Sequence, residues 1–286
     1  MLDLLLVPLA AALVILAMNA YFGLHVIRRG VIFVDLAFAQ IAAVGGTVAF
    51  LFGAPADSFS SYAFSFGFTL LGALFFSLTR TDDSQVSQEA YIGISYVVAS
   101  AVVILLASFS AEGTEHVKET LTGSLIWITW PAVLKIAAAY ALIGLFHFVF
   151  RRQMLGVTFA PGTVRHVRLW DFIFYVSFGF AVTFSVNHAG VLLIFSTLVI
   201  PAVIAFLFTS RFVPALLIAW AAGTVAIAGG LVASFVWDLT TGPLLVVAFG
   251  AVLVLAVLGK AVSGRVPVRA ERSARSEASA RGVAPS

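Results

Sequence analysis

Residues 189–210 read AGVLLIFSTLVIPAVIAFLFTS, an apolar run that contains no charged side chain and ends at Arg211. A run of about 20 such residues is long enough to cross the hydrocarbon core of a bilayer as a helix. In lipid the backbone must satisfy its own hydrogen bonds, which favours helices for every comparable run in the chain. The sequence predicts membrane-spanning helices at 4–26, 31–53, 61–79, 89–109, 126–150, 169–186, 189–210, 213–236 and 242–261.

The predicted fold class is therefore an all-α polytopic membrane protein with about eight or nine transmembrane helices. The count depends on Asn187 and His188, because residues 169–210 form either two spans or one span with a broken, partly re-entrant segment. Of the 286 residues 62% are hydrophobic and 10% are charged, whereas soluble domains carry about 25% charged residues. The absence of cysteine excludes disulfides and thiolate metal sites. The net charge of +3 gives no indication of nucleic-acid binding.

The basic residues predict the orientation, because cytoplasmic loops carry an excess of Lys and Arg. With the N-terminus outside, the residues that fall inside are Arg28, Arg29, Arg80, Arg151, Arg152, Arg165, Arg168, Arg211 and Lys260. Only Lys118 and Lys135 fall outside or near the outer face. We therefore expect a multi-pass protein of the inner (plasma) membrane with a cytoplasmic C-terminus.

The chain divides into a transmembrane domain at 1–263 and a tail at 264–286. The tail is rich in Arg, Ser, Ala and Glu and has no apolar periodicity, so it is predicted to be disordered and cytoplasmic. Met1-Leu2-Asp3 lacks the basic region of a signal peptide, so the first apolar run is interpreted as a retained helix.

Several catalytic motifs are missing from the sequence. It has no G-x-x-x-x-G-K-[ST] phosphate loop, no His-Glu-x-x-His zinc motif and no recognisable hydrolase triad. We therefore expect no enzyme activity in this chain, and a transporter, a channel or a structural membrane subunit remains.

Polar side chains within a span are costly and are candidates for functional sites. Asp35 and Gln40 lie in the second predicted span and share a helix face only loosely, and Asn19 lies in the first. We predict that these three line a translocation path, with Asp35 as the only good acidic candidate. Alternatively, Asp35 pairs with a basic residue at the inner surface, and Gln40 forms a hydrogen bond between helices. His147, near the inner end of the fifth predicted span, is interpreted as an interfacial residue, and His25 lies next to Arg28 and Arg29 near the inner end of the first.

The predicted outer loop carries the remaining metal-ligand candidates. If it is helical, Glu112, Glu115, His116 and Glu119 fall on one face at i, i+3, i+4 and i+7. Carboxylates and an imidazole suit Zn²⁺ or Mn²⁺. A solvated charged face is the competing interpretation of the same spacing.

Ordered segments of the chain resemble a known family. They are GLHVIRRGVIFVD at Gly23–Asp35, YIGISY at Tyr91–Tyr96, LTGSL at Leu121–Leu125 and GVLLIFSTLVIPA at Gly190–Ala202. Over about residues 5–260 the chain is similar to the zinc/manganese/iron-type metal permeases of ATP-binding-cassette importers.

This resemblance implies a homodimeric permease that binds no cofactor of its own and transports a divalent metal. It also implies a cytoplasmic ATP-binding subunit and an extracytoplasmic solute-binding protein as partners, besides the lipid bilayer and a second copy. The loop at 151–168 stands where the family has its ATPase-coupling helix, with Arg151, Arg152, Arg165 and Arg168 as the coupling candidates. An ordinary basic inner loop is the alternative.

Two departures from the family concern the cargo and the loop. Family members carry an Asp and a His four apart in the second span, where this chain has Leu36 and Gln40. Asp35 is displaced by one residue, about 100° around a helix. The loop reads Phe159-Ala160-Pro161-Gly162 in place of an Asp-Pro-Glu-like start. The cargo is therefore a metal ion, a complexed metal or another solute.

Pro201 and Gly190 are predicted to make the seventh span a bending element, because proline lacks an N–H and can kink a helix. A static kink is the alternative for Pro201. Two other functions stay open for the whole chain. An ion-coupled secondary transporter would need acidic residues at the midplane and often has inverted repeats. A structural or assembly subunit would need no conduction path.

Overall fold

The computed structural model describes residues 2–55, 58–80, 85–109 and 125–262. The long helices are α1 (Leu2–Arg29), α2 (Val34–Leu51), α3 (Phe59–Leu78), α4 (Gln88–Ala107), α6 (Trp130–Val149), α8 (Val167–Ala189), α9 (Val191–Phe208), α10 (Phe212–Trp237) and α11 (Thr241–Val262). The shorter elements are α7 (Arg151–Phe159) and the 3₁₀ turns η1 (Leu125–Trp127) and η2 (Pro161–Thr163). Nine helices in this described part are long and apolar enough to cross a membrane, which confirms the predicted all-α polytopic fold.

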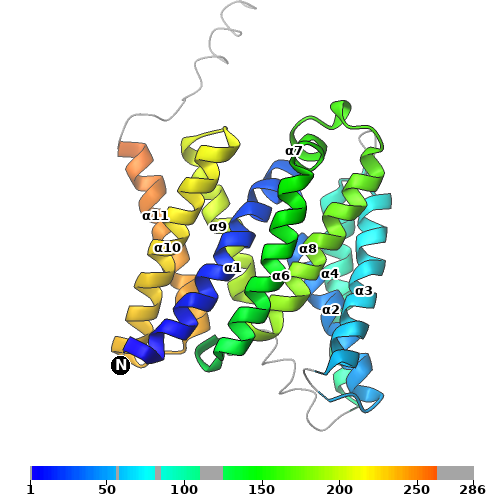
Figure 1. Ribbon diagram of the computed structural model, residues 1–286, viewed down its shortest axis with the longest axis horizontal. Coiled ribbons are helices and arrows are strands. Elements are labelled where there is room, and N and C mark those ends of the chain that lie inside the picture. Colours follow the sequence, from blue (N-terminus) through cyan, green and yellow to red (C-terminus); the bar gives the residue numbers. More distant parts are fainter. Residues whose placement is uncertain (1, 56–57, 81–84, 110–124, 263–286) are drawn as a thin grey trace, which may run out of the picture.

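The helices form two groups that meet along α1, α6 and α8 (Figure 1). In the first group α9, α10 and α11 pack against one another, and α1 packs on α9 and α10. In the second group α2 packs on α3 and α4, and α8 packs on α3 and α2. Helix α6 contacts both α1 and α8 and so lies against both groups.

Buried aromatic rings join the two groups. Phe22 of α1 lies 4.9 Å from Phe178 of α8, and Phe178 lies 5.8 Å from Phe38 of α2, measured between ring centroids. All three side chains are fully buried. Such rings contribute large buried areas and prefer tilted or edge-on contacts of this length.

Glycines at positive φ separate consecutive helices at two of the predicted breaks. Gly30 (φ 68°) ends α1 after its two arginines, and Gly190 (φ 76°) is the single residue between α8 and α9. A residue without a β-carbon adopts this backbone conformation without steric cost. Residues 169–210 are therefore two separate helices, which decides between the two interpretations of this stretch.

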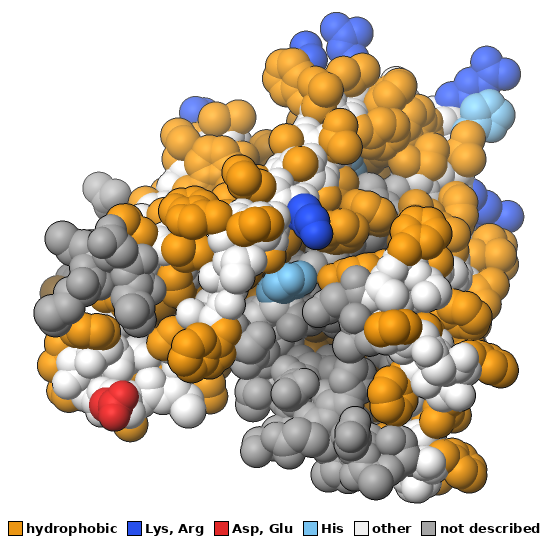
Figure 2. All heavy atoms as spheres, turned by 60° about the horizontal axis from the view of Figure 1, so that its bottom comes forward, with side chains coloured by type: hydrophobic (Ala, Val, Ile, Leu, Met, Phe, Trp, Pro, Cys, Tyr) orange, Lys and Arg blue, Asp and Glu red, His pale blue; other side chains and the backbone are white. Residues whose placement is uncertain are grey.

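Most basic residues gather at one end of the bundle, which we call the basic end. It holds the C-terminus of α1, the C-terminus of α3, helix α7, the α9–α10 turn and the C-terminus of α11, whereas the N-terminus lies at the opposite end (Figure 1). Figure 2 shows most Lys and Arg side chains along the upper and right edges of the molecule, with one in the middle of a largely hydrophobic face. The distribution agrees with the single-sided pattern expected from the sequence.

Candidate functional site

Asn19 lies in the middle of α1 and connects it to α9. Its Nδ2 donates to Thr197 Oγ1 at 2.9 Å and approaches the carbonyl of Ile194 at 3.5 Å. Asn19 and Thr197 are both buried. A polar side chain at this depth needs a partner on a neighbouring helix. Asn19 therefore fixes α1 on the segment that includes Pro201.

Asp35 lies in the first turn of α2 and is buried. Neither of its carboxylate oxygens has a hydrogen-bond partner among the described residues. Asp35 does not form the ion pair with a neighbouring basic residue that the sequence offered as an alternative. Arg29, the nearest such residue before it in the sequence, binds Asp171 instead. Glu89, at the start of α4, accepts a hydrogen bond from the backbone N–H of Phe33 at 3.1 Å, next to the start of α2. A buried carboxylate without a partner is costly, which keeps Asp35 a functional candidate.

The structure describes Gln40 but not the outer-loop metal candidates. Gln40 is buried in α2, one and a half turns beyond Asp35. The predicted outer-loop set, Glu112, Glu115, His116 and Glu119, lies outside the described residues. Within the described ranges no three His, Asp or Glu side chains come together as a metal-binding group.

The two predicted hinge residues lie at the start and in the middle of α9. Gly190 is the joint at which α9 begins, and Pro201 lies inside α9, which continues past it to Phe208. Pro201 is buried in the bundle. A bending role for this pair stays a prediction.

The predicted coupling loop is a short amphipathic helix followed by a 3₁₀ turn. Met154 and Val157 of α7 are fully buried against the bundle. The four arginines of the segment have exposed side chains: Arg151, Arg152, Arg165 and Arg168. Helix α7 therefore seats its apolar face on the spans and carries exposed arginines at the basic end.

A buried carboxylate that the sequence analysis did not identify lies beneath this helix. Asp171 of α8 is fully buried, and its Oδ1 accepts from Arg29 Nη1 at 2.9 Å. Its Oδ2 accepts from Arg80 Nη1, and Arg80 also donates to the Val157 carbonyl at 3.3 Å from both Nη1 and Nη2. Asp171 thus binds the end of α1 and the segment after α3 at once.

Arg29 and His25 hold the last turn of α7 from the other side. Thr158 Oγ1 is bonded to His25 Nδ1 at 2.7 Å and accepts from Arg29 Nε at 2.9 Å. The Arg29 guanidinium also lies 3.8 Å above the Phe174 ring of α8, a favourable cation–π position. We call Asp171, Arg29, Arg80, His25 and Thr158 the α7 anchor.

The sequence contained one signal for this cluster. Asp171 is an acidic residue inside an apolar run, and such residues are functional candidates by default. Its partners Arg29 and Arg80 are 142 and 91 residues away in the chain, so their convergence follows from the packing of α1, α3 and α8 and not from local spacing.

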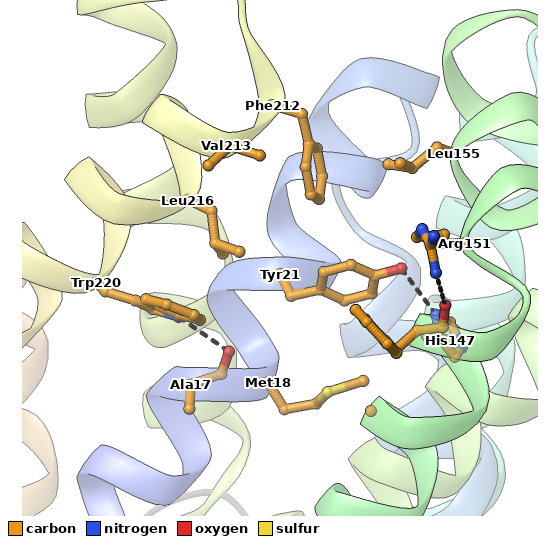
Figure 3. A pocket seen from close by; sticks show the side chains of 12 residues that line it. Ala17, Met18, Tyr21, His147, Arg151, Leu155, Phe212, Val213, Leu216 and Trp220 are labelled. Atoms are coloured by element: carbon orange, nitrogen blue, oxygen red, sulfur yellow. Dashed lines mark hydrogen bonds between the residues drawn. The ribbon is translucent and has the colours of Figure 1, made fainter.

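The interpretation of His147 as an interfacial residue is wrong, because its side chain is buried and hydrogen-bonded between helices. His25 is buried as well and is bonded to α7. His147 Nδ1 is bonded to the Tyr21 hydroxyl at 2.9 Å, and its Nε2 to Ser177 Oγ at 2.8 Å. Tyr21 and His147 lie on the wall of an apolar cavity of about 430 Å³ between α1, α6 and α10 (Figure 3). On its far side Trp220 Nε1 donates to the carbonyl of Ala17 at 3.0 Å (Figure 3).

Nine helices long and apolar enough to cross a membrane, within the part of the chain that the structure describes, define a polytopic membrane protein. Buried polar side chains lie between these helices, and the amphipathic helix α7 carries exposed arginines at one end. The chain belongs to the ABC 3 transport family, which it matches over residues 1–260. This confirms the family resemblance of its ordered motifs.

Two curated proteins to which the chain is similar are named as manganese transport proteins. The chain is 23% identical over 207 residues to the manganese transport system membrane protein MntB of Synechocystis, covering 70% of this chain and 66% of that protein. It is 21% identical over 240 residues to the manganese transport system membrane protein MntC of Listeria innocua, covering 82% and 83%. The match to MntB therefore spans about two thirds of that protein's length.

Two solved structures share the fold. PsaBC from Streptococcus pneumoniae in complex with Fab superposes with a TM-score of 0.73 at 19% identity, over 88% of this chain and 90% of that one. An inward-facing transporter described as metal-chelate type superposes with a TM-score of 0.66 at 19% identity, over 89% and 85%.

Proposed function

We propose that this chain is the permease subunit of an ATP-binding-cassette importer for a divalent metal ion, with manganese as the first candidate. Membership of the ABC 3 transport family supports the transport role. The names of the curated relatives support manganese. Oxygen donors such as those of Asp35, Gln40 and Asn19 suit Mn²⁺. Zinc and iron belong to the same cargo class, and a complexed metal is the alternative because the usual Asp/His pair is absent.

The observation that carries the proposal is the arrangement of α7. Its buried Met154 and Val157 fix it to the spans, while Arg151 and Arg152 on the same helix are exposed. A helix of this kind can seat in a groove of a partner and pass its movement to the bundle. ATP hydrolysis then takes place in that partner, at the basic end.

The proposed contact between α7 and the ATPase also sets the orientation of the chain in the membrane. The basic end faces the cytoplasm, so the C-terminus of α11 is cytoplasmic and the N-terminus of α1 is outside the plasma membrane. The solute-binding protein docks at the opposite end. A second copy of the chain completes the translocation path in the bilayer.

The path runs along buried polar side chains of α1 and α2. Asn19, Asp35 and Gln40 contribute oxygen atoms on these two helices. Because Asn19 is bonded to Thr197 of α9, bending of α9 between Gly190 and Pro201 would move this side chain. Access then alternates between the two faces as α9 bends.

The test uses the assembled importer. In one variant the four exposed arginines of the α7 segment, Arg151, Arg152, Arg165 and Arg168, are replaced by alanine. The matched control is Arg211→Ala, an exposed arginine at the α9–α10 turn of the same end. We expect the fourfold variant to fold normally but to lose co-purification with the ATPase and ATP hydrolysis stimulated by metal-loaded binding protein. The control should keep both. Normal coupling in the fourfold variant would reject α7 as the contact.

A further inference from the structure

The α7 anchor is centred on one buried carboxylate with two buried or half-buried cations. The side chains of Asp171 and Arg29 are 0% and 5% exposed, and that of Arg80 is 18% exposed. Among the residues that the structure describes, these are the only ion pairs. A single negative charge therefore compensates two guanidinium groups that would otherwise repel each other.

The anchor joins elements that belong to different helix groups. Arg29 is the last residue of α1, which packs with α9 and α10, whereas Arg80 follows α3, which packs with α2 and α8. Both arginines also bind the last turn of α7, Arg29 through the Thr158 hydroxyl and Arg80 through the Val157 carbonyl. Asp171 thus lies where α7 meets both groups.

We infer that Asp171 is a positioning residue that transmits the movement of α7 to the two helix groups through Arg29 and Arg80. This inference rests on the proposed importer function. A displacement of α7 pulls on Thr158 and Val157, and the shared carboxylate makes the ends of α1 and α3 follow together. Without the carboxylate the two cations separate, and α7 moves without carrying both groups.

A role in fold stability alone makes a different prediction. Buried ion pairs are weak contributors to stability, and well-packed apolar residues of similar size often replace them without loss. The triple variant Arg29→Met, Arg80→Met, Asp171→Leu should therefore fold and assemble. It keeps the packing of α1, α3 and α8 but removes the polar links to Thr158 and Val157.

The experiment measures ATP hydrolysis by the reconstituted importer, with and without metal-loaded binding protein. Allosteric coupling between two sites typically amounts to roughly 5- to 150-fold, so we expect Asp171→Asn to reduce the stimulation at least about fivefold. Asp171→Glu, which keeps the charge, should restore part of it. The control Arg211→Gln removes an exposed charge at the α9–α10 turn of the basic end and should leave both the basal and the stimulated rates unchanged.

The outcomes distinguish a failure of the proposed function from a failure of the role of Asp171. A wild-type complex that shows no stimulation would reject the proposed function itself. A stimulated wild type together with a fully stimulated Asp171→Asn or triple variant would reject only the role of Asp171. A triple variant that assembles but is not stimulated supports the role. If neither Asp171→Asn nor the triple variant assembles, Thr158→Val provides the test, because it removes the anchor's hydroxyl on α7 with little change of shape. Reduced stimulation of this variant supports the inference, and full stimulation overturns it.

Discussion

The packing of α2 on α3 allows a stability prediction with an internal control. Gly45 of α2 lies directly on the backbone of α3, where a β-carbon would stand 2.6 Å from the Phe64 carbonyl oxygen and 2.7 Å from Ser65 Cα. Both are backbone atoms that cannot rotate away, so Gly45→Ala forces the two helices apart. Overpacking of this kind costs about 1–3 kcal/mol.

Gly67 provides the matched control on the partner helix. A β-carbon there meets nothing within 4 Å. Both substitutions add one methyl group inside a helix and gain about 0.8–1.0 kcal/mol of helix propensity. The propensity terms cancel in the comparison, so Gly45→Ala should unfold more easily than Gly67→Ala by about 1–3 kcal/mol.

The measurement is unfolding of the two purified variants in detergent, by titration with a denaturing detergent and circular dichroism. Wild type is expected between them or close to the Gly45→Ala variant, and Gly67→Ala should be the most stable. Equal stability of the two variants would show that α2 and α3 do not pack at Gly45.

Three further predictions concern the helices and their orientation. Asn19→Leu should cost only about 0.6 kcal/mol and at most about 1.7, the range for hydrogen bonds between membrane helices, because Thr197 Oγ1 keeps bonds to the carbonyls of its own helix; a much larger loss in the same unfolding assay would contradict this. Since the natural chain has no cysteine, a membrane-impermeant maleimide added outside intact cells should label Asp238→Cys but not Arg165→Cys, and the reverse pattern would invert the proposed orientation. Pro201→Ala should slow metal uptake without loss of assembly, and an unchanged uptake rate would reject bending of α9.

The spans could be predicted because each is a continuous apolar run, and hydropathy does not depend on tertiary packing. The break at Gly30 follows from the two arginines that precede it. The break at 187–190 was ambiguous, because α8 and α9 are joined by one residue and no polar loop separates them. Only the backbone conformation at Gly190 decides it.

The α7 anchor could not be predicted from spacing, because each of its bonds connects distant segments. Arg29 and Asp35 are close in sequence, which suggested a local pair, yet Gly30 turns the chain between them and Arg29 bonds to α8. His147 has phenylalanine neighbours typical of an interface, but Tyr21 and Ser177 on other helices satisfy both of its nitrogens. In each case the partner is set by helix packing.

ATP-driven uptake of ⁵⁴Mn²⁺ into proteoliposomes tests the central claim most directly. The chain would be reconstituted with its ATPase subunit, and metal-loaded binding protein supplied on the side opposite the basic end. The account predicts uptake that needs the ATPase subunit and hydrolysable ATP, and none from the chain alone under a proton or sodium gradient. Gradient-driven uptake by the chain alone would contradict the account and indicate a secondary transporter.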